Sequence, residues 1–104
     1  MAPIWKNASS FEWDLGNIEK NWIKHQVTYQ EAEEAFFSRP ALVFEDEGHS
    51  ESERRLLLWG QTGKGRYLAV VFTYRVEKIR VISARPMNRK ERTAYEKTKE
   101  NPDF

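Results

Sequence analysis

Apolar residues follow a helical spacing in the first third of the chain and a strand spacing in the middle. After Asp14, whose carboxylate can cap a first turn, apolar residues recur every three or four positions and predict a helix that ends near His25. Thr28–Glu31 has the form of a capping box and predicts a second helix. That helix ends before Pro40, because the residue preceding a proline is pushed out of helical geometry.

The middle of the chain is predicted to form an antiparallel sheet of about four strands. The expected strands span residues 41–45, 54–61, 66–74 and 78–84, and residues 11–13 have the composition of a short edge strand. Both faces of 66–74 are apolar, which favours a central place in the sheet. Residues 62–65, with two glycines, form the turn that precedes it.

The most informative segment runs from Ile79 to Tyr95, IRVISARPMNRKERTAY. It begins as an apolar strand, turns at Pro86 and opens a third helix at Asn88, whose side chain can cap the first turn. Four arginines fall near this junction: Arg80, Arg85, Arg89 and Arg92. A guanidinium group stays charged at physiological pH and offers a planar fork of donors that matches phosphate oxygens. A solvated helix face with surface ion pairs is the alternative, and the segment alone favours neither.

Two helices, a run of strands and a last helix indicate an α+β fold rather than a doubly wound parallel sheet. The 104 residues are enough for one domain with one core. We expect a leader over residues 1–10, a single compact domain over residues 11–100 and a tail over residues 101–104.

Charge is unevenly placed, although the net charge is only +1. Residues 45–53 are acidic and residues 75–99 are rich in arginine and lysine, which suggests a basic working face and an acidic edge. The lack of cysteine excludes disulfides and thiolate metal sites and favours a reducing compartment. The N-terminus has no signal-peptide pattern and the longest apolar run, Leu68–Phe72, is too short to span a bilayer, so we expect a soluble cytoplasmic protein.

Lys24 and His25 are adjacent at the end of the first predicted helix. Imidazole can exchange protons near neutral pH, and a neighbouring lysine could hold a phosphate oxygen. Cations at a helix C-terminus are also favoured by the dipole alone, and for the isolated pair this simpler interpretation is the stronger one. His49 lies among acidic residues whose spacing matches no known metal-binding loop, so no metal or other cofactor is expected. Tyr95 is the aromatic residue retained as a candidate for stacking an RNA base.

Together, these residues favour cleavage of RNA. If the sheet brings Arg54, Arg80 and Arg85 close to Lys24 and His25, the site holds several cations and one titrating group. A base would take the proton of the 2′-hydroxyl, the cations would stabilise the charged phosphorane, and an acid would protonate the 5′-oxygen. DNA lacks the 2′-hydroxyl and would not react.

Several motifs occur in an order found in one known family. They are FEWD at Phe11–Asp14, Asn21, Lys24-His25, Glu31-Ala32, Asp46–His49, Glu53-Arg54, Gly60 and the long run from Arg80 to Glu96. They cover roughly residues 11–96. Only the segment from Ile82 to Tyr95 is specific for the family without the other motifs. In this ordered set the chain resembles the BrnT toxins, the ribonuclease partners of BrnA antitoxins in bacterial type II toxin–antitoxin pairs.

This resemblance implies a compact RelE-like fold and metal-independent RNA cleavage that inhibits translation and growth. It also implies a BrnA-like antitoxin with a ribbon-helix-helix DNA-binding part. Two toxin–antitoxin pairs would form a heterotetramer that represses its own operon, with operator DNA bound only through the antitoxin. The catalytic candidates carried over are Lys24, His25, Arg54, Arg80 and Arg85, and the RNA-binding candidates are Arg89, Arg92 and Tyr95.

The chain departs from the family pattern at two places. Gln26 stands where the family usually has glycine after Lys-His, and Leu15 and Asn17 stand where it often has proline and lysine. A left-handed helix end would suit Gln26 less well than glycine, which bears on the position of His25. Two other functions remain as alternatives: a non-catalytic module that binds nucleic acid or protein through the same basic face, and a metal-dependent phosphodiesterase built on the acidic loop.

Overall fold

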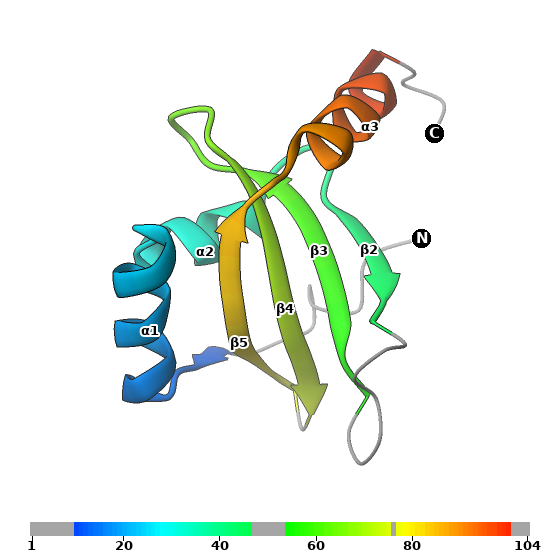
Figure 1. The fold of residues 1–104 in the computed structure, drawn as a ribbon. Helices are drawn as coiled ribbons and strands as arrows, with labels where there is room; N and C mark the ends of the chain where they lie inside the picture. Colours follow the sequence, from blue (N-terminus) through cyan, green and yellow to red (C-terminus); the bar gives the residue numbers. More distant parts are fainter. Residues whose placement is uncertain (1–9, 47–53, 76, 101–104) are drawn as a thin grey trace.

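The computed structural model describes residues 10–46, 54–75 and 77–100. Its elements, in chain order, are β1 (Ser10–Glu12), α1 (Leu15–His25), α2 (Tyr29–Ala35), β2 (Leu42–Glu45), β3 (Leu56–Gln61), β4 (Tyr67–Arg75), β5 (Lys78–Pro86) and α3 (Arg89–Glu100). The predicted α+β order is confirmed, because two helices precede the main run of strands and one follows it (Figure 1). The expected leader and tail fall almost entirely outside the described residues.

The sheet has five strands in the order β1-β5-β4-β3-β2 and is mixed, whereas the sequence predicts about four antiparallel strands. The difference is β1, which agrees within one residue with the short edge strand expected over residues 11–13. It pairs in parallel with the start of β5, so that Ser10 lies opposite Lys78 and Glu12 opposite Arg80. The parallel pairing was not predicted, because its partner lies far along the chain. β4 occupies the predicted central position.

β5 runs to Pro86, two residues past its predicted end at Ala84. Pro86 lies opposite Leu68 of β4, and the backbone N–H of Met87 then donates to the carbonyl oxygen of Tyr67 at 3.0 Å. Proline is commonly a sign of a turn, but it is tolerated at the end of a strand, where its missing N–H removes little pairing. The turn into α3 therefore comes slightly later than the sequence suggests.

β5 contains a bulge that changes which of its side chains face the core. Val71 of β4 lies opposite Ser83, but the next residue, Phe72, lies opposite Val81, so Ile82 is an extra residue on β5. Before the bulge the odd-numbered residues of β5 are buried, and after it an even-numbered residue is buried. Residues five positions apart across the bulge therefore point to the same face, which simple alternation would not allow.

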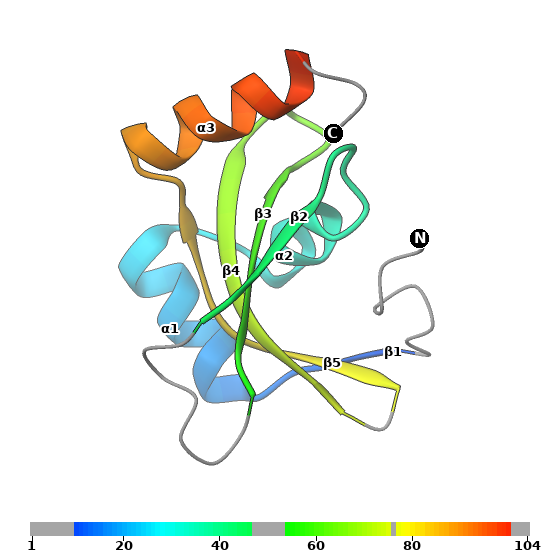
Figure 2. The same ribbon diagram turned by 90° about the vertical axis from the view of Figure 1, so that its right-hand side faces the viewer.

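One face of the sheet is covered by α2 and carries the main core (Figures 1 and 2). Phe36, which caps α2, packs edge-on against Phe72 of β4, with ring centroids 4.9 Å apart. Gly60 of β3 lies beneath α2, and a Cβ atom there would be 2.3 Å from the carbonyl oxygen of Ala35. Glycine is thus required at residue 60 for α2 to lie directly on β3.

The other face of the sheet, called here the open face, carries the side chains that point away from α2. Among the described elements only α3 packs on it, at the end where β5 finishes (Figures 1 and 2). A smaller core at that end comprises Ala69, Met87 and Tyr95. We call this the α3 end of the sheet, and the opposite end, where Arg75 and Lys78 lie opposite each other, the far end.

α1 runs along the edge of β5 beyond β1 and takes the place of a neighbouring strand. The side-chain amide of Asn17 donates to the carbonyl oxygen of Val81 at 3.5 Å, and the backbone N–H of Ala84 donates to the side-chain oxygen of Asn21 at 3.2 Å. Buried backbone groups at a sheet edge need such partners. The two bonds align α1 with β5, so that the C-terminal end of α1 lies toward the α3 end (Figure 1). His25 is the last residue of α1.

α1 ends at Gln26, which adopts the left-handed conformation with φ 56° and ψ 37°. Its backbone N–H donates to the carbonyl oxygen of Trp22 at 2.9 Å, and its side-chain amide donates to the same oxygen at 3.0 Å. The chain can then turn sharply into Val27 and α2. The left-handed helix end anticipated from the family pattern is therefore present, and Gln26 rather than glycine forms it.

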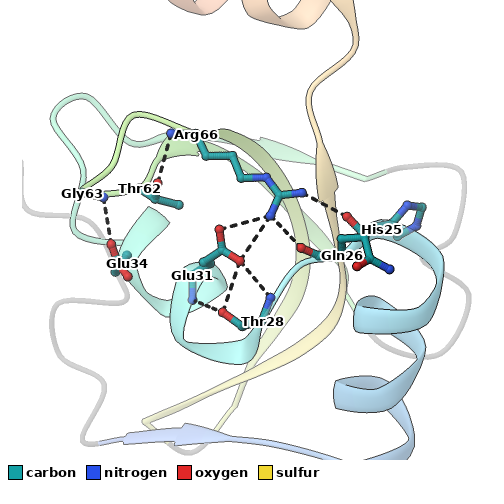
Figure 3. Close-up of polar contacts among 8 residues, drawn as sticks. All are labelled: His25, Gln26, Thr28, Glu31, Glu34, Thr62, Gly63 and Arg66. Atoms are coloured by element: carbon teal, nitrogen blue, oxygen red, sulfur yellow. Dashed lines mark hydrogen bonds and ion pairs between the residues drawn. The ribbon is translucent and has the colours of Figure 1, made fainter.

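The guanidinium group of Arg66, immediately before β4, holds the end of α1 (Figure 3). Its Nη2 donates to the carbonyl oxygen of His25 at 3.0 Å, and its Nη1 donates to that of Gln26 at 2.7 Å. The same Nη1 lies 3.1 and 3.2 Å from the two carboxylate oxygens of Glu31 in α2. A positive charge thus lies at the negative end of the α1 dipole, and one side chain joins α1, α2 and the β3–β4 turn.

Glu31 also completes the predicted capping box, which is confirmed. Its backbone N–H donates to Thr28 Oγ1 at 3.1 Å, and the backbone N–H of Thr28 donates to the Glu31 carboxylate at 3.1 Å. Partial burial raises the pKa of Glu31, but the hydrogen bonds from the Thr28 backbone and from Arg66 outweigh it and hold the pKa below its ordinary value of 4.5. The charged carboxylate is therefore favoured by folding.

Replacing Gln26 with glycine should raise the free energy of unfolding by about 0.5–1 kcal/mol, because a left-handed residue with a Cβ atom costs about 1–2 kcal/mol, partly offset by the greater unfolded-state freedom of glycine. Urea denaturation measures the change. Gln26→Ala is the matched control, since it loses the side-chain hydrogen bond but keeps the Cβ atom and should show no gain. A Gln26→Gly protein less stable than the wild type would contradict the view that the left-handed conformation of Gln26 is strained.

Replacing Glu31 with glutamine should lower the free energy of unfolding by about 1–2 kcal/mol at neutral pH, because glutamine retains the cap but loses the charge-assisted bond to Arg66. Folding lowers the pKa of Glu31, so its contribution is complete above the unfolded value near 4.5 and is lost as the pH falls through the lower folded value. Urea unfolding of both proteins across this range should show the difference narrowing below pH 4.5. A difference that is constant with pH would argue against a role for the charge.

Candidate functional site

Three of the five catalytic candidates lie where α1 and β5 finish side by side. The bond between Asn21 and Ala84 comes one helical turn before His25 and one residue before Arg85, so it brings the ends of both elements together. Lys24 is exposed and His25 is partly exposed. The imidazole of His25 points away from Arg66, which binds only its carbonyl oxygen (Figure 3). We call Lys24, His25 and Arg85 the α1–β5 corner.

Arg85 is not a free cation, because Glu91 from the first turn of α3 pairs with it. Its Nη1 and Nη2 donate to the two carboxylate oxygens of Glu91 at 2.7 and 2.9 Å. The Arg85 side chain is 37% exposed and that of Glu91 only 12%. This end-on pairing occupies one N–H of each terminal nitrogen, and Nη1 also donates to the carbonyl oxygen of Pro86 at 3.3 Å. The second N–H of Nη2 is left for another anion.

The carboxylate of Glu91 also caps α3. The backbone N–H of Asn88 donates to it at 2.9 Å, and the backbone N–H of Glu91 donates to the Asn88 side chain at 2.8 Å. The hydrogen bonds from Arg85 lower the pKa of Glu91 most, burial opposes them, and the Asn88 bond lowers it further. The indole of Trp59 also lowers this pKa, although its buried N–H makes no hydrogen bond of ordinary geometry to the described residues. The predicted cap at Asn88 is confirmed, whereas the pairing of Glu91 with Arg85 was not predicted from the sequence.

The other two catalytic candidates lie at the far end of the sheet. Arg80 is opposite Thr73 near the start of β5, and Arg54 precedes β3 and forms an exposed ion pair with Glu45. Five residue steps along β5 separate Arg80 from Arg85, which is about 16 Å at ~3.3 Å per residue. The single cluster expected from the sequence is therefore divided into the α1–β5 corner and a distant pair of arginines.

The three RNA-binding candidates on α3 have different surroundings. Arg89 is exposed at the start of the helix, and the guanidinium of Arg92 lies 4.4 Å from the ring centroid of Tyr67. Tyr95 is fully buried, and its hydroxyl donates to the carbonyl oxygen of Pro40 at 2.6 Å. Burial raises the pKa of this phenol. The prediction that Tyr95 stacks an RNA base is corrected: its ring is part of the core beneath α3.

Sequence reasoning missed two polar residues that organise the site. Arg66 was not distinguishable from other basic residues next to a turn, because its partners on α1 and α2 are about 40 residues away. Glu91 was recognisable as a cap residue, but its pairing with Arg85 depends on the angle at which α3 leaves β5. Capping patterns are local in sequence, whereas these contacts are set by tertiary packing.

Within residues 10–46, 54–75 and 77–100, no group of three or more His, Cys, Asp or Glu side chains is placed to hold a metal ion. The stretch containing His49 lies outside the described residues. None of the helices described here combines the length and apolar character needed to cross a membrane.

Comparisons with known proteins agree with this fold. The family model described as the ribonuclease toxin BrnT of type II toxin–antitoxin systems matches residues 13–91. The crystal structure of the Brucella abortus ribonuclease toxin BrnT, at 1.1 Å resolution, superposes with a TM-score of 0.60 and 26% sequence identity, covering 77% of this chain and 97% of that chain. No curated protein sequence shows significant similarity. The extent of the family match establishes that this chain belongs to the BrnT family of ribonuclease toxins of type II toxin–antitoxin systems.

Proposed function

We propose that this protein is a toxin endoribonuclease that cleaves RNA without a metal ion, by attack of the RNA's own 2′-hydroxyl. The observation that carries the proposal is the α1–β5 corner, where the imidazole of His25 and the cations Lys24 and Arg85 lie at adjoining element ends in a member of a ribonuclease toxin family. A titrating group beside two cations supplies what this reaction needs.

The reaction requires two proton transfers and stabilisation of charge. A base removes the proton of the 2′-hydroxyl, the 2′-oxygen forms a bond to phosphorus, and the bond from phosphorus to the 5′-oxygen breaks. The 5′-oxygen takes a proton, and the products are a 2′,3′-cyclic phosphate and a free 5′-hydroxyl. His25 is assigned to proton transfer, while Lys24 and the remaining N–H of Arg85 Nη2 stabilise the charged phosphorane.

Arg54 and Arg80 are assigned no contact with the reacting phosphate, because they lie at the far end of the sheet. Arg89, exposed at the start of α3, is suited to bind the RNA backbone close to the corner. The proposed cleavage site thus uses three of the five catalytic candidates and one of the three RNA-binding candidates.

The proposed biological setting follows from the family. A BrnA-like antitoxin with a ribbon-helix-helix part would neutralise the toxin, and two toxin–antitoxin pairs would form a heterotetramer. Operator DNA would be bound only by the antitoxin. Released in the bacterial cytoplasm, the toxin would cleave RNA, inhibit translation and arrest growth.

One observation favours a second function, a non-catalytic module that binds nucleic acid or protein. The bidentate pairing with Glu91 partly neutralises Arg85, while the solvent-facing side of α3 carries Arg89, Lys90 and Lys97. Such a surface would bind an RNA strand with strong salt dependence and no turnover. The cleavage experiment separates the two functions.

Incubating the purified protein with labelled single-stranded RNA in the presence of a chelator should give fragments that end in a 2′,3′-cyclic phosphate. His25→Ala should reduce the rate by about 10²–10⁴-fold, the usual worth of a general acid or base. Lys64→Ala, at the exposed tip of the β3–β4 turn, removes a charge away from the corner and should cleave normally. Intact RNA with a folded wild-type protein would favour the binding module, and activity only with added metal would exclude metal independence.

A test of the role of Arg85 requires a variant that does not leave the partly buried Glu91 carboxylate unpaired. The Arg85→Ala/Glu91→Gln double variant meets this need, and Glu91→Gln alone is its matched control, since glutamine can still accept the capping hydrogen bond from Asn88. The double variant should lose about 10²–10³-fold in kcat, the usual effect of removing one charge-stabilising donor. Equal rates for the double variant and Glu91→Gln would remove Arg85 from the mechanism.

Glu91→Gln alone should bind RNA more tightly and turn over more slowly. Loss of the carboxylate removes a negative charge near the incoming phosphate, which lowers KM, and it loosens the orientation of Arg85, which lowers kcat. Steady-state kinetics on a short RNA would measure both quantities. A rise in KM would contradict the view that Glu91 competes with phosphate for Arg85.

A further inference from the structure

A small cavity at the far end of the open face gathers positive charge. It has a volume of about 220 Å³ and is lined by Glu12, Thr73, Arg75, Lys78 and Arg80. Three of these five side chains are cations and one is a carboxylate. Thr73 is almost fully buried, whereas Lys78 is exposed, so the cavity has a polar floor and a cationic rim.

The bulge in β5 places this cavity on the same face as the α1–β5 corner. Arg80 is opposite Thr73, and Arg85 is opposite Ala69, and both partners are odd-numbered residues of β4. The even-numbered residues of β4 in this region, such as Val70, face the core under α2. Without the extra residue Ile82, Arg80 and Arg85 would point to opposite faces.

The two positively charged sites are therefore joined by one side of one strand. The distance along β5 is about 16 Å at ~3.3 Å per residue. A nucleic-acid strand advances about 3.4 Å per stacked nucleotide and further when it is unstacked, so this distance corresponds to at most about five nucleotides. Between the sites the open face presents Ser83 and Val71, which lie opposite each other and are only partly buried.

We infer that the cavity lined by Thr73, Lys78 and Arg80 binds a backbone phosphate of the RNA substrate, a few nucleotides away from the phosphate that reacts at the α1–β5 corner. The inference rests on the proposed ribonuclease function. Arg80 lies too far from His25 to take part in the chemistry, and in this arrangement it positions the RNA strand. A phosphate group fits this site because guanidinium, ammonium and hydroxyl groups can all donate to its oxygens.

Neutralising Glu12 provides a test in which the expected change in RNA binding is opposite to that for removing a cation. It lies opposite Arg80 in the β1–β5 pair, and its carboxylate lines the same cavity. A negative charge there opposes phosphate binding, so removing it should strengthen RNA binding. A gain of binding cannot result from misfolding, which keeps the inference testable even if a cation variant is poorly folded.

The experiment measures binding of the full chain to a labelled 12-nucleotide single-stranded RNA whose 2′-oxygens are methylated to prevent cleavage, over a range of salt concentrations. Lys78→Ala and Arg80→Gln should each weaken binding and reduce the slope of log K against log salt by about 0.7, the value for one lost contact to a single strand. Glu12→Gln should tighten binding. Lys64→Ala is the matched control and should leave the slope unchanged.

A three-nucleotide RNA of the same chemistry is too short to reach both sites, so Lys78→Ala and Arg80→Gln should not change the salt dependence of its binding at the corner. Wild-type salt slopes for both variants on the 12-nucleotide RNA would overturn the inference, while cleavage by the wild type would leave the proposed function standing. Conversely, loss of slope in these variants with no cleavage by the wild type would support the cavity and refute the ribonuclease function.

Discussion

The arrangement of the site depends on how the unpaired edge of β5 is satisfied. β1 is only three residues long and pairs with the start of β5, so the backbone of the remaining edge needs other partners. Asn17 and Asn21 of α1 supply them. These two amides determine that α1 lies along β5, and the end of α1 is consequently brought beside the end of β5. Arg66 then fixes the last turn of α1, so the position of His25 is set from both sides.

The bulge at Ile82 is a second determinant of the charged surface, because it decides which charged residues of β5 share a face. Alternation alone would place Arg80 and Arg85 on opposite sides of the sheet, with one of them directed at the core. With the bulge, the core face retains Val81 and Ala84 while both arginines lie on the open face. One extra residue thus allows the same strand to contribute to a well-packed core and to carry two arginines on the open face.

Local sequence patterns predicted most of the fold, and they failed where tertiary contacts decide. The capping box at Thr28, the central place of β4 and the cap at Asn88 are each encoded by a few neighbouring residues, and each is confirmed. The bulge in β5 depends on the register between β4 and β5, which local patterns do not define. The parallel pairing of β1 and the hydrogen bonds from Arg66 to α1 involve partners far apart in the chain, which a single sequence does not reveal. Tyr95 was misjudged for a related reason: its burial comes from contacts with Pro40 and Tyr67, which lie far from it in sequence.

The shared use of Glu91 also constrains the length of the chain between β5 and α3. The same carboxylate accepts from Asn88, which fixes where the helix begins, and from Arg85, which fixes the direction of the guanidinium. Met87 lies between them, before the helix begins, and its backbone N–H donates to the carbonyl oxygen of Tyr67. Inserting or deleting one residue there would move Asn88 and Glu91 together relative to Arg85 even if every side chain were retained. The spacing from Arg85 to Glu91 is therefore as restricted as the identity of either residue.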